Sequence, residues 1–238
     1  MVRKTGSTTD IPFQDKLQAK VQSAICMIEY QDLDKAEKEL RVALLWYEQK
    51  KESELLDDYF PSQAQFFLGE IYRTFFEHVE LDPEKGEAKL AKDLEYKCEL
   101  LLSAQGHYLR AIRLGNGQWA TSAGYRIGEL YEKLYDEMLA AKVPAEFDEE
   151  QKQVYREELR KKVRVLVTKA MGIYERTLAA AERIGVDNPF VQKTRRSLER
   201  MKQLLLEEAD RESPPPAVKA ARPAASRRAV PAPPRKAA

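Results

Sequence analysis

Histidines and carboxylates are the residues of this chain whose types could support acid–base or metal chemistry. The chain contains only two histidines, His78 and His107. Metal sites and hydrolases need such groups at fixed spacings, for example two histidines four residues apart on one helix face. His78 has only Glu77 beside it, and His107 has no Cys, Asp or Glu at a recognised ligand spacing. We therefore expect packed or solvated histidines rather than catalytic or metal-binding ones.

Paired carboxylates and glycine-rich turns offer no better chemistry. The acidic runs at 148–150 and 157–158 lie among basic residues with helical spacing, which is typical of exposed helix faces. The turn at 115–117 reads Gly-Asn-Gly and lacks the Lys and Ser/Thr of a phosphate-binding loop. The sequence predicts a protein that is not an enzyme, with no cofactor, no metal site and no small-molecule substrate.

Charge is divided unevenly along the chain. Six of the 40 basic residues lie in 213–238, which has no acidic residue, so 34 basic residues face 39 acidic ones in 1–212. The segment 212–238 is rich in proline and alanine, lacks aromatic residues and is predicted to be disordered. It could be a solubilising end, a proline-rich ligand or a basic arm making weak contact with an anionic surface. Without interleaved aromatic residues for base stacking, nucleic acid is not the expected partner.

Targeting signals and cysteines indicate a cytoplasmic setting. No apolar run approaches the roughly 18 residues of a membrane span. The first residues contain no apolar segment of a secretory signal, so we expect a cytoplasmic location, with attachment to an envelope complex as the alternative. Cys26 and Cys98 fall in apolar helical stretches and are expected to be buried free thiols.

The apolar pattern repeats with the 3.6-residue period of helices almost throughout, and strand signals are absent. A flexible N-terminus at 1–10 should precede a helical domain at 11–211. Caps and breaks predict seven helices, at about 10–30, 32–51, 62–80, 82–114, 116–142, 148–184 and 188–210.

An internal repeat relates the middle of the chain to its later part. FFLGEIYRTFFEHV at 66–79 aligns without a gap on YRIGELYEKLYDEM at 125–138, with Gly, Glu and Tyr identical. Downstream of this match, both copies contain a small residue, an aromatic residue four places later and another small residue three places after that. The shared positions are Leu68, Gly69, Tyr72, Ala104, Tyr108 and Ala111 in one copy, and Ile127, Gly128, Tyr131, Ala170, Tyr174 and Thr177 in the other.

These positions resemble the tetratricopeptide repeat (TPR), a helical hairpin of 34 residues. The resemblance covers about 12–211 and implies an all-α, right-handed solenoid of three hairpins plus a C-terminal capping helix. The glycine-to-alanine spacing departs from the family: it is 35 from Gly69 to Ala104 and 42 from Gly128 to Ala170, where the family has about twelve. Because the inserted residues have helical patterns, the second helices should be overlong.

The resemblance also implies where two glycines and a binding groove should lie. Gly69 and Gly128 should sit where the two helices of a hairpin cross, so that a side chain would hold the helices apart. The first helices of such stacks line a groove that grips a peptide or helix. The residues carried over as partner-binding are Phe66, Glu70, Arg73, Tyr125, Glu129 and Glu132. The alternative is that the two aromatic rings pack under neighbouring helices.

The expected function is a non-enzymatic scaffold or adaptor that holds a partner protein within a multiprotein assembly. Residues 117–200 resemble, more faintly, an extended TPR type in envelope and motility proteins of gliding bacteria, which implies a bacterial motility complex. The lysine and asparagine with which cochaperones of this family hold Hsp70 or Hsp90 are replaced by Val21 and Ile25. The alternative function is a chaperone-like or regulatory protein that sequesters a client.

Overall fold

The computed structural model describes residues 11–53, 56–143 and 147–212, and all regular secondary structure in these residues is helical. The helices are α1 (Phe13–Glu29), α2 (Leu33–Lys50), α3 (Tyr59–His78), α4 (Glu87–Arg113), α5 (Gly117–Ala140), α6 (Glu149–Ile184) and α7 (Pro189–Glu212), with one 3₁₀ turn, η1 (Pro83–Lys85), before α4. The segments 1–10 and 213–238, predicted to be flexible and disordered, lie outside the described residues.

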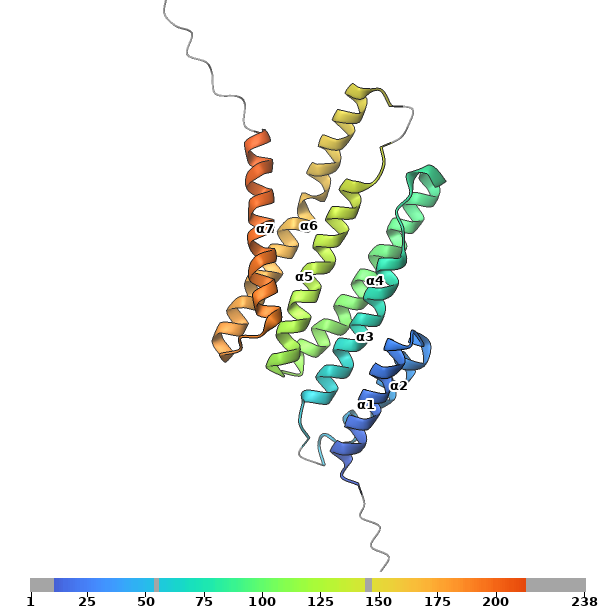
Figure 1. The fold of residues 1–238 in the computed structure, drawn as a ribbon, viewed down its shortest axis with the longest axis vertical. Helices are drawn as coiled ribbons and strands as arrows, with labels where there is room; N and C mark the ends of the chain where they lie inside the picture. The colour runs from blue at the N-terminus through green and yellow to red at the C-terminus, as the bar shows by residue number, and fades with distance from the viewer. Residues whose placement is uncertain (1–10, 54–55, 144–146, 213–238) are drawn as a thin grey trace, which may run out of the picture.

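The helices form three antiparallel hairpins, α1–α2, α3–α4 and α5–α6, stacked side by side, and α7 ends the row (Figure 1). Each hairpin also packs against the next through α2 with α3, α4 with α5, and α6 with α7. The first helices form a second set of contacts, α1 with α3, α3 with α5, and α5 with α7. The predicted all-α arrangement of three hairpins and a seventh helix is confirmed.

Side-chain caps fix the later helix boundaries where the sequence predicts them. The Asn116 side chain accepts a hydrogen bond from the Trp119 backbone N–H at the start of α5. Asp148 and Gln151 form a reciprocal capping box at the start of α6, which ends at Gly185 in the left-handed conformation. Asn188 accepts two backbone hydrogen bonds in the first turn of α7.

Two helix starts differ from the prediction, because of a proline and a glycine. Helix α3 begins at Tyr59 rather than near residue 62, with Pro61 in its first turn, where a missing N–H leaves no helix bond unmade. Asp82 and Pro83 start only the turn η1, in which Asp82 accepts from the Glu84 N–H. Helix α4 starts after Gly86, because the positive φ of this glycine, +92°, is incompatible with a helix that continues from η1 into α4.

The two repeat glycines lie at close helix crossings, as predicted. A Cβ atom on Gly69 would lie 2.6 Å from Tyr108 Cδ1, and one on Gly128 would lie 2.6 Å from Tyr174 Cδ1. Both tyrosines are fully buried. Glycine at each site therefore lets a tyrosine ring of the second helix pack directly against the backbone of the first helix. The second helices are overlong, as predicted, with 27 residues in α4 and 36 in α6.

The cysteine prediction is only partly met. Both thiols are free, but Cys98 is half-buried and Cys26 is exposed. Cys26 lies on the side of α1 opposite Ala24, which is fully buried against α2 and α3. The apolar stretch around Cys26 thus covers more of α1 than the face that packs.

Candidate functional site

The six residues predicted to bind a partner lie together on the α3–α5 side of the stack, but their two rings are not open to a ligand. Only 4% of Phe66 and 8% of Tyr125 is exposed. The expectation of an accessible aromatic ladder is therefore corrected, and the alternative of rings packed under neighbouring helices holds. Burial, followed by the nearby Glu129 carboxylate, raises the pKa of Tyr125.

Two aromatic side chains from other elements cover these rings. Trp119, in the first turn of α5, lies with its ring centroid 5.1 Å from that of Phe66. The ring centroid of Phe190, in the first turn of α7, lies 6.4 Å from that of Phe66 and 5.8 Å from that of Tyr125. Docking of α7 on α5 therefore closes the place where an aromatic ladder would have been exposed.

The four charged members of the predicted set are already engaged within the protein. Glu70 lies 3.0 Å from both Arg73 and Arg126, and its other contact is the Tyr108 hydroxyl, which donates to it at 2.5 Å. Arg73 also pairs with Glu77. Glu129 pairs with Arg126 and accepts a hydrogen bond from the Tyr125 hydroxyl. Glu132 pairs with Arg200 and accepts a hydrogen bond from the Tyr174 hydroxyl. A ligand on this face would have to compete with these internal pairs.

His107 is a structural residue at the α3–α4 seam. Its ring stacks on Tyr72 with centroids 5.4 Å apart, and its Nδ1 lies 3.0 Å from the Gln65 side-chain oxygen. Burial is the main reason that the pKa of His107 is lowered to about 4; the positive charges of Arg110 and Arg41 contribute to this lowering, and Glu37 opposes it. The imidazole is therefore neutral in the folded protein at neutral pH.

A pH dependence of stability follows from this lowered pKa. The unfolded chain takes up a proton near pH 6.5, whereas folded His107 does so only near pH 4, so stability is lost as the pH falls between these values. The full interval corresponds to about 3 kcal/mol, at about 1.4 kcal/mol per pKa unit. Urea unfolding should show a flatter pH profile for His107→Gln than for the wild type. Parallel profiles would contradict the assignment.

A groove on the other side of the stack is open and largely apolar. We call it the α4–α6 groove, because α4 and α6 form its walls and α5 its floor; it has a volume of about 500 Å³. It is lined by Gln105, Leu109 and Ile112 of α4, Ala120, Thr121, Gly124 and Ile127 of α5, and Ile173, Arg176, Thr177, Ala180 and Ile184 of α6. Arg176 is the charged residue in this lining. Helices α4 and α6 do not pack directly against each other within the described residues.

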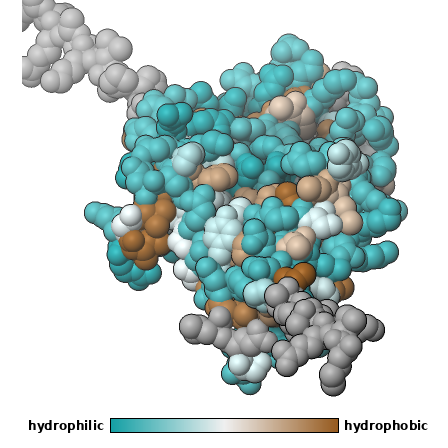
Figure 2. Space-filling model, turned by 60° about the horizontal axis from the view of Figure 1, so that its bottom comes forward, coloured by the Kyte–Doolittle hydropathy of each residue, from teal (hydrophilic) through white to brown (hydrophobic). Residues whose placement is uncertain are grey.

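The groove reaches the end of the molecule where α4 and α6 end and α5 begins. Figure 2 looks toward this end and shows hydrophobic patches on a mostly hydrophilic surface. Ile184, the last residue of α6, is 48% exposed here. Gly124 forms part of the floor, and a Cβ atom on it would lie 2.8 Å from Thr177 Cγ2, so this glycine also brings α5 close to α6.

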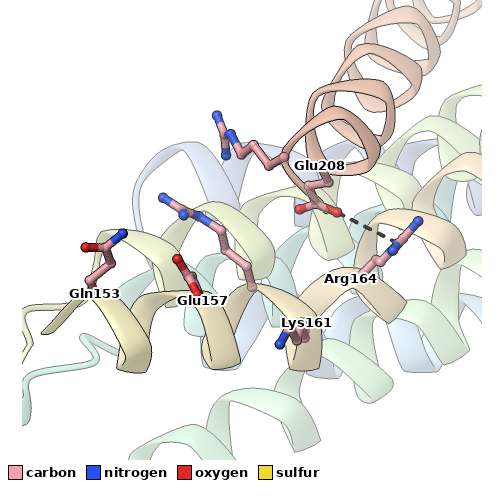
Figure 3. A pocket seen from close by; sticks show the side chains of 7 residues that line it. Gln153, Glu157, Lys161, Arg164 and Glu208 are labelled. Atoms are coloured by element: carbon pink, nitrogen blue, oxygen red, sulfur yellow. Dashed lines mark ion pairs between the residues drawn. The ribbon is translucent and has the colours of Figure 1, made fainter. Parts of the chain in front are cut away.

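A second pocket, of about 620 Å³, separates α6 from α7 and is lined by charged and polar side chains (Figure 3). Its lining residues are Gln153, Glu157, Arg160, Lys161, Arg164, Glu208 and Arg211. Arg164 Nε lies 3.8 Å from Glu208, which also accepts a hydrogen bond from the buried Tyr135 hydroxyl. This pocket has polar walls and no apolar floor, so it is less suited to holding a protein segment than the α4–α6 groove.

The described part of the chain presents neither a cluster of metal ligands nor a membrane-spanning helix. No three His, Cys, Asp or Glu side chains there lie close enough to hold a metal ion. None of the described helices is long and apolar enough to cross a membrane.

Comparison with known proteins adds two distant structural similarities. No family model matches the chain, and no curated protein matches it significantly. Among solved structures, it is similar to the DHF79 filament, with 18% identity, 85% of this chain and 92% of that chain covered, and a TM-score of 0.37. It is also similar to the de novo designed helical repeat protein DHR64, with 16% identity, coverage of 83% and 95%, and a TM-score of 0.30. The tetratricopeptide resemblance therefore stays a prediction.

Sequence reasoning missed the α4–α6 groove. Its residues lie at ordinary helical spacing and appear as part of the apolar stripe that packs in the core. The signal in the sequence was an apolar stripe wider than the packed core needs. In the structure, three of its residues, Leu109, Ile112 and Ile173, are only partly buried. Their position between two second helices depends on the spacing of the hairpins, which the sequence does not specify.

Proposed function

We propose that this chain is a non-enzymatic adaptor that holds a segment of a partner protein in the α4–α6 groove within a multiprotein assembly. The observation that carries the proposal is the groove itself, an apolar opening of about 500 Å³ between two helices. Apolar grooves between helices are a recurrent way of binding protein segments, since burial of apolar area supplies the free energy.

The resemblance to tetratricopeptide repeats supports an adaptor role, but the proposed surface is not the one that the family uses. The proposal leaves Phe66 and Tyr125 as core residues and moves the contact to the second helices. The fainter resemblance of residues 117–200 favours an envelope or motility complex of a gliding bacterium as the assembly. A chaperone-like protein that sequesters clients is the other candidate.

Retention of a partner by groove variants tests the proposal. Ala180→Glu with Ile184→Glu places two charges in the groove at partly exposed positions, so folding should be preserved. The matched control is Leu206→Glu on α7, where the leucine is 61% exposed. From cells that express the chain, the wild type and the control should retain a stoichiometric partner, and the double variant should retain at least about tenfold less.

Two results would contradict the proposed adaptor function of the α4–α6 groove. Unchanged retention by a groove variant that remains helical by circular dichroism would exclude the α4–α6 groove. Weak retention of many different proteins, with none in stoichiometric amount, would favour the chaperone-like alternative.

A further inference from the structure

We infer that the segment held in the α4–α6 groove is an acidic amphipathic helix of two to three turns. The inference rests on the proposed function and specifies the chemistry of the partner. It draws on the length of the groove, the character of its floor and the charges along its rim.

The length of the groove suits a short helix. Its α4 wall extends from Gln105 to Ile112 and its α6 wall from Ile173 to Ile184. At 1.5 Å per residue these walls are about 10 and 16 Å long, which matches two to three helical turns. Such a helix would present apolar residues at i, i+3 or i+4, and i+7 to the floor.

The floor favours a helix over an extended peptide. It consists of side chains of α5, including Ala120 and Ile127, and the backbone N–H and C=O groups of that helix are paired internally. An extended segment would leave its own backbone groups without partners against such a surface. A helix satisfies these groups itself and buries only its apolar side chains.

The rim of the groove carries positive charge. Lys169, Arg176 and Arg183 recur every seven residues along α6 and form one exposed row beside the lining residues. On the opposite wall, the exposed Arg113 lines a separate pocket toward α2, so we place the positive rim along α6. None of these three α6 cations makes an ion pair in the part of the chain that the structure describes; Lys169 lies over the Tyr131 ring, 5.4 Å from its centroid.

This rim differs from the ion-paired opposite side of the stack. On the α3–α5–α7 side, arginines such as Arg73, Arg126 and Arg200 are each paired with carboxylates. The chain outside 213–238 is acidic, with 34 basic and 39 acidic residues. Unpaired cations bordering an apolar groove on an acidic body complement a partner with Asp or Glu flanking its apolar face.

The same charges argue against the chain's own basic segment as the occupant. Residues 213–238 carry six basic residues and no acidic residue, so the rim would repel them. A second copy of the chain is a distinguishable alternative, because it would make the protein self-associate through the same surface.

Two designed peptides test the inference by fluorescence anisotropy with the full chain. One is a short helical peptide with leucines at i, i+4 and i+7 flanked by glutamates, and its twin has lysine at every glutamate. The acidic peptide should bind and should bind more weakly as salt rises. The triple variant Lys169→Glu, Arg176→Glu, Arg183→Glu should weaken acidic-peptide binding at least about tenfold and favour the lysine twin.

A variant with the same net charge controls for long-range electrostatics. Arg156→Glu, Arg196→Glu, Lys202→Glu reverses three exposed cations away from the groove, and should bind the acidic peptide nearly as the wild type does. Equal weakening in both triple variants would overturn the inferred rim contact.

Other outcomes separate this inference from the adaptor function. If both peptides bind equally and only Ala180→Glu with Ile184→Glu weakens them, the acidic preference is wrong and the groove remains a docking site. If neither peptide binds, the inferred occupant is wrong, and partner retention by the groove variants decides the adaptor function separately. Self-association of the wild type that the rim reversal abolishes would assign the groove to a second copy instead.

Discussion

Gly128→Leu is expected to destabilise the fold strongly. The new side chain would meet the ring of Tyr174, which is fully buried and donates a hydrogen bond to Glu132 at 2.7 Å. The ring cannot move aside without losing this bond and its packing. Overpacking of this kind costs on the order of 1–3 kcal/mol or more. For a domain of this size the melting temperature should fall by about 3–10 °C.

A second pair of glycines provides matched controls. Gly106 and Gly172 also lie inside α4 and α6, but a Cβ atom on either would meet only the guanidinium of the same helix, at 3.7 Å or more. Gly106→Ala should therefore stabilise the protein by up to about 1 kcal/mol through helix propensity. Thermal unfolding of Gly128→Leu, Gly128→Ala and Gly106→Ala compares their melting temperatures with that of the wild type. A wild-type melting temperature for Gly128→Leu would refute the close crossing.

Lys97→Met should cause the other large loss of stability. The Lys97 ammonium group is fully buried and donates to the backbone carbonyls of Phe76 at 2.8 Å and Val79 at 2.7 Å. It also lies 2.6 Å from Glu137 of α5. It thus pairs the Val79 carbonyl just beyond the end of α3, and it adds a second hydrogen bond to the Phe76 carbonyl, which also accepts from the Val79 N–H at 3.3 Å. Loss of both hydrogen bonds, which leaves the Val79 carbonyl without its side-chain partner, should lower the free energy of unfolding by about 1–3 kcal/mol.

Glu137→Gln separates the carbonyl contacts of Lys97 from its ion pair. Glu137 is 38% exposed, so its pair with Lys97 is partly screened by water and should contribute less than about 1 kcal/mol. Urea unfolding should rank wild type, Glu137→Gln and Lys97→Met in order of decreasing stability. Equal losses in the two variants would show that the ion pair, rather than the carbonyl contacts, supplies the stabilisation.

The sequence predicted the features of the fold that local residues decide. Helix α6 begins at the capping box of Asp148 and ends at Gly185 as expected, because caps act over a few residues. The crossings at Gly69 and Gly128 followed from a repeated pattern in which each glycine has a tyrosine partner in the next helix. Lys97 had no such signal, since its carbonyl partners lie about twenty residues earlier in the chain.

The candidate site was less predictable, because it depends on how the hairpins and α7 sit together. Phe66 and Tyr125 have the spacing of groove-lining residues, yet Phe190 covers both from a different helix. That cover depends on the angle at which α7 docks on α5. No pattern within residues 66–79 or 125–138 encodes this angle, so an exposed ring and a buried ring look the same in the sequence.

The ion pairs of the first helices have a mechanical consequence. Glu70 with Arg126 ties α3 to α5, and Asp136 with Arg200 ties α5 to α7, whereas α4 and α6 on the opposite side do not pack directly against each other. A row of hairpins fastened along one edge should bend most easily at its open edge, so we expect the width of the α4–α6 groove to vary more than the spacing of the first helices. A helix seated there would act as a wedge and set the curvature of the row. Docking would thereby change the distance between the first hairpin and α7.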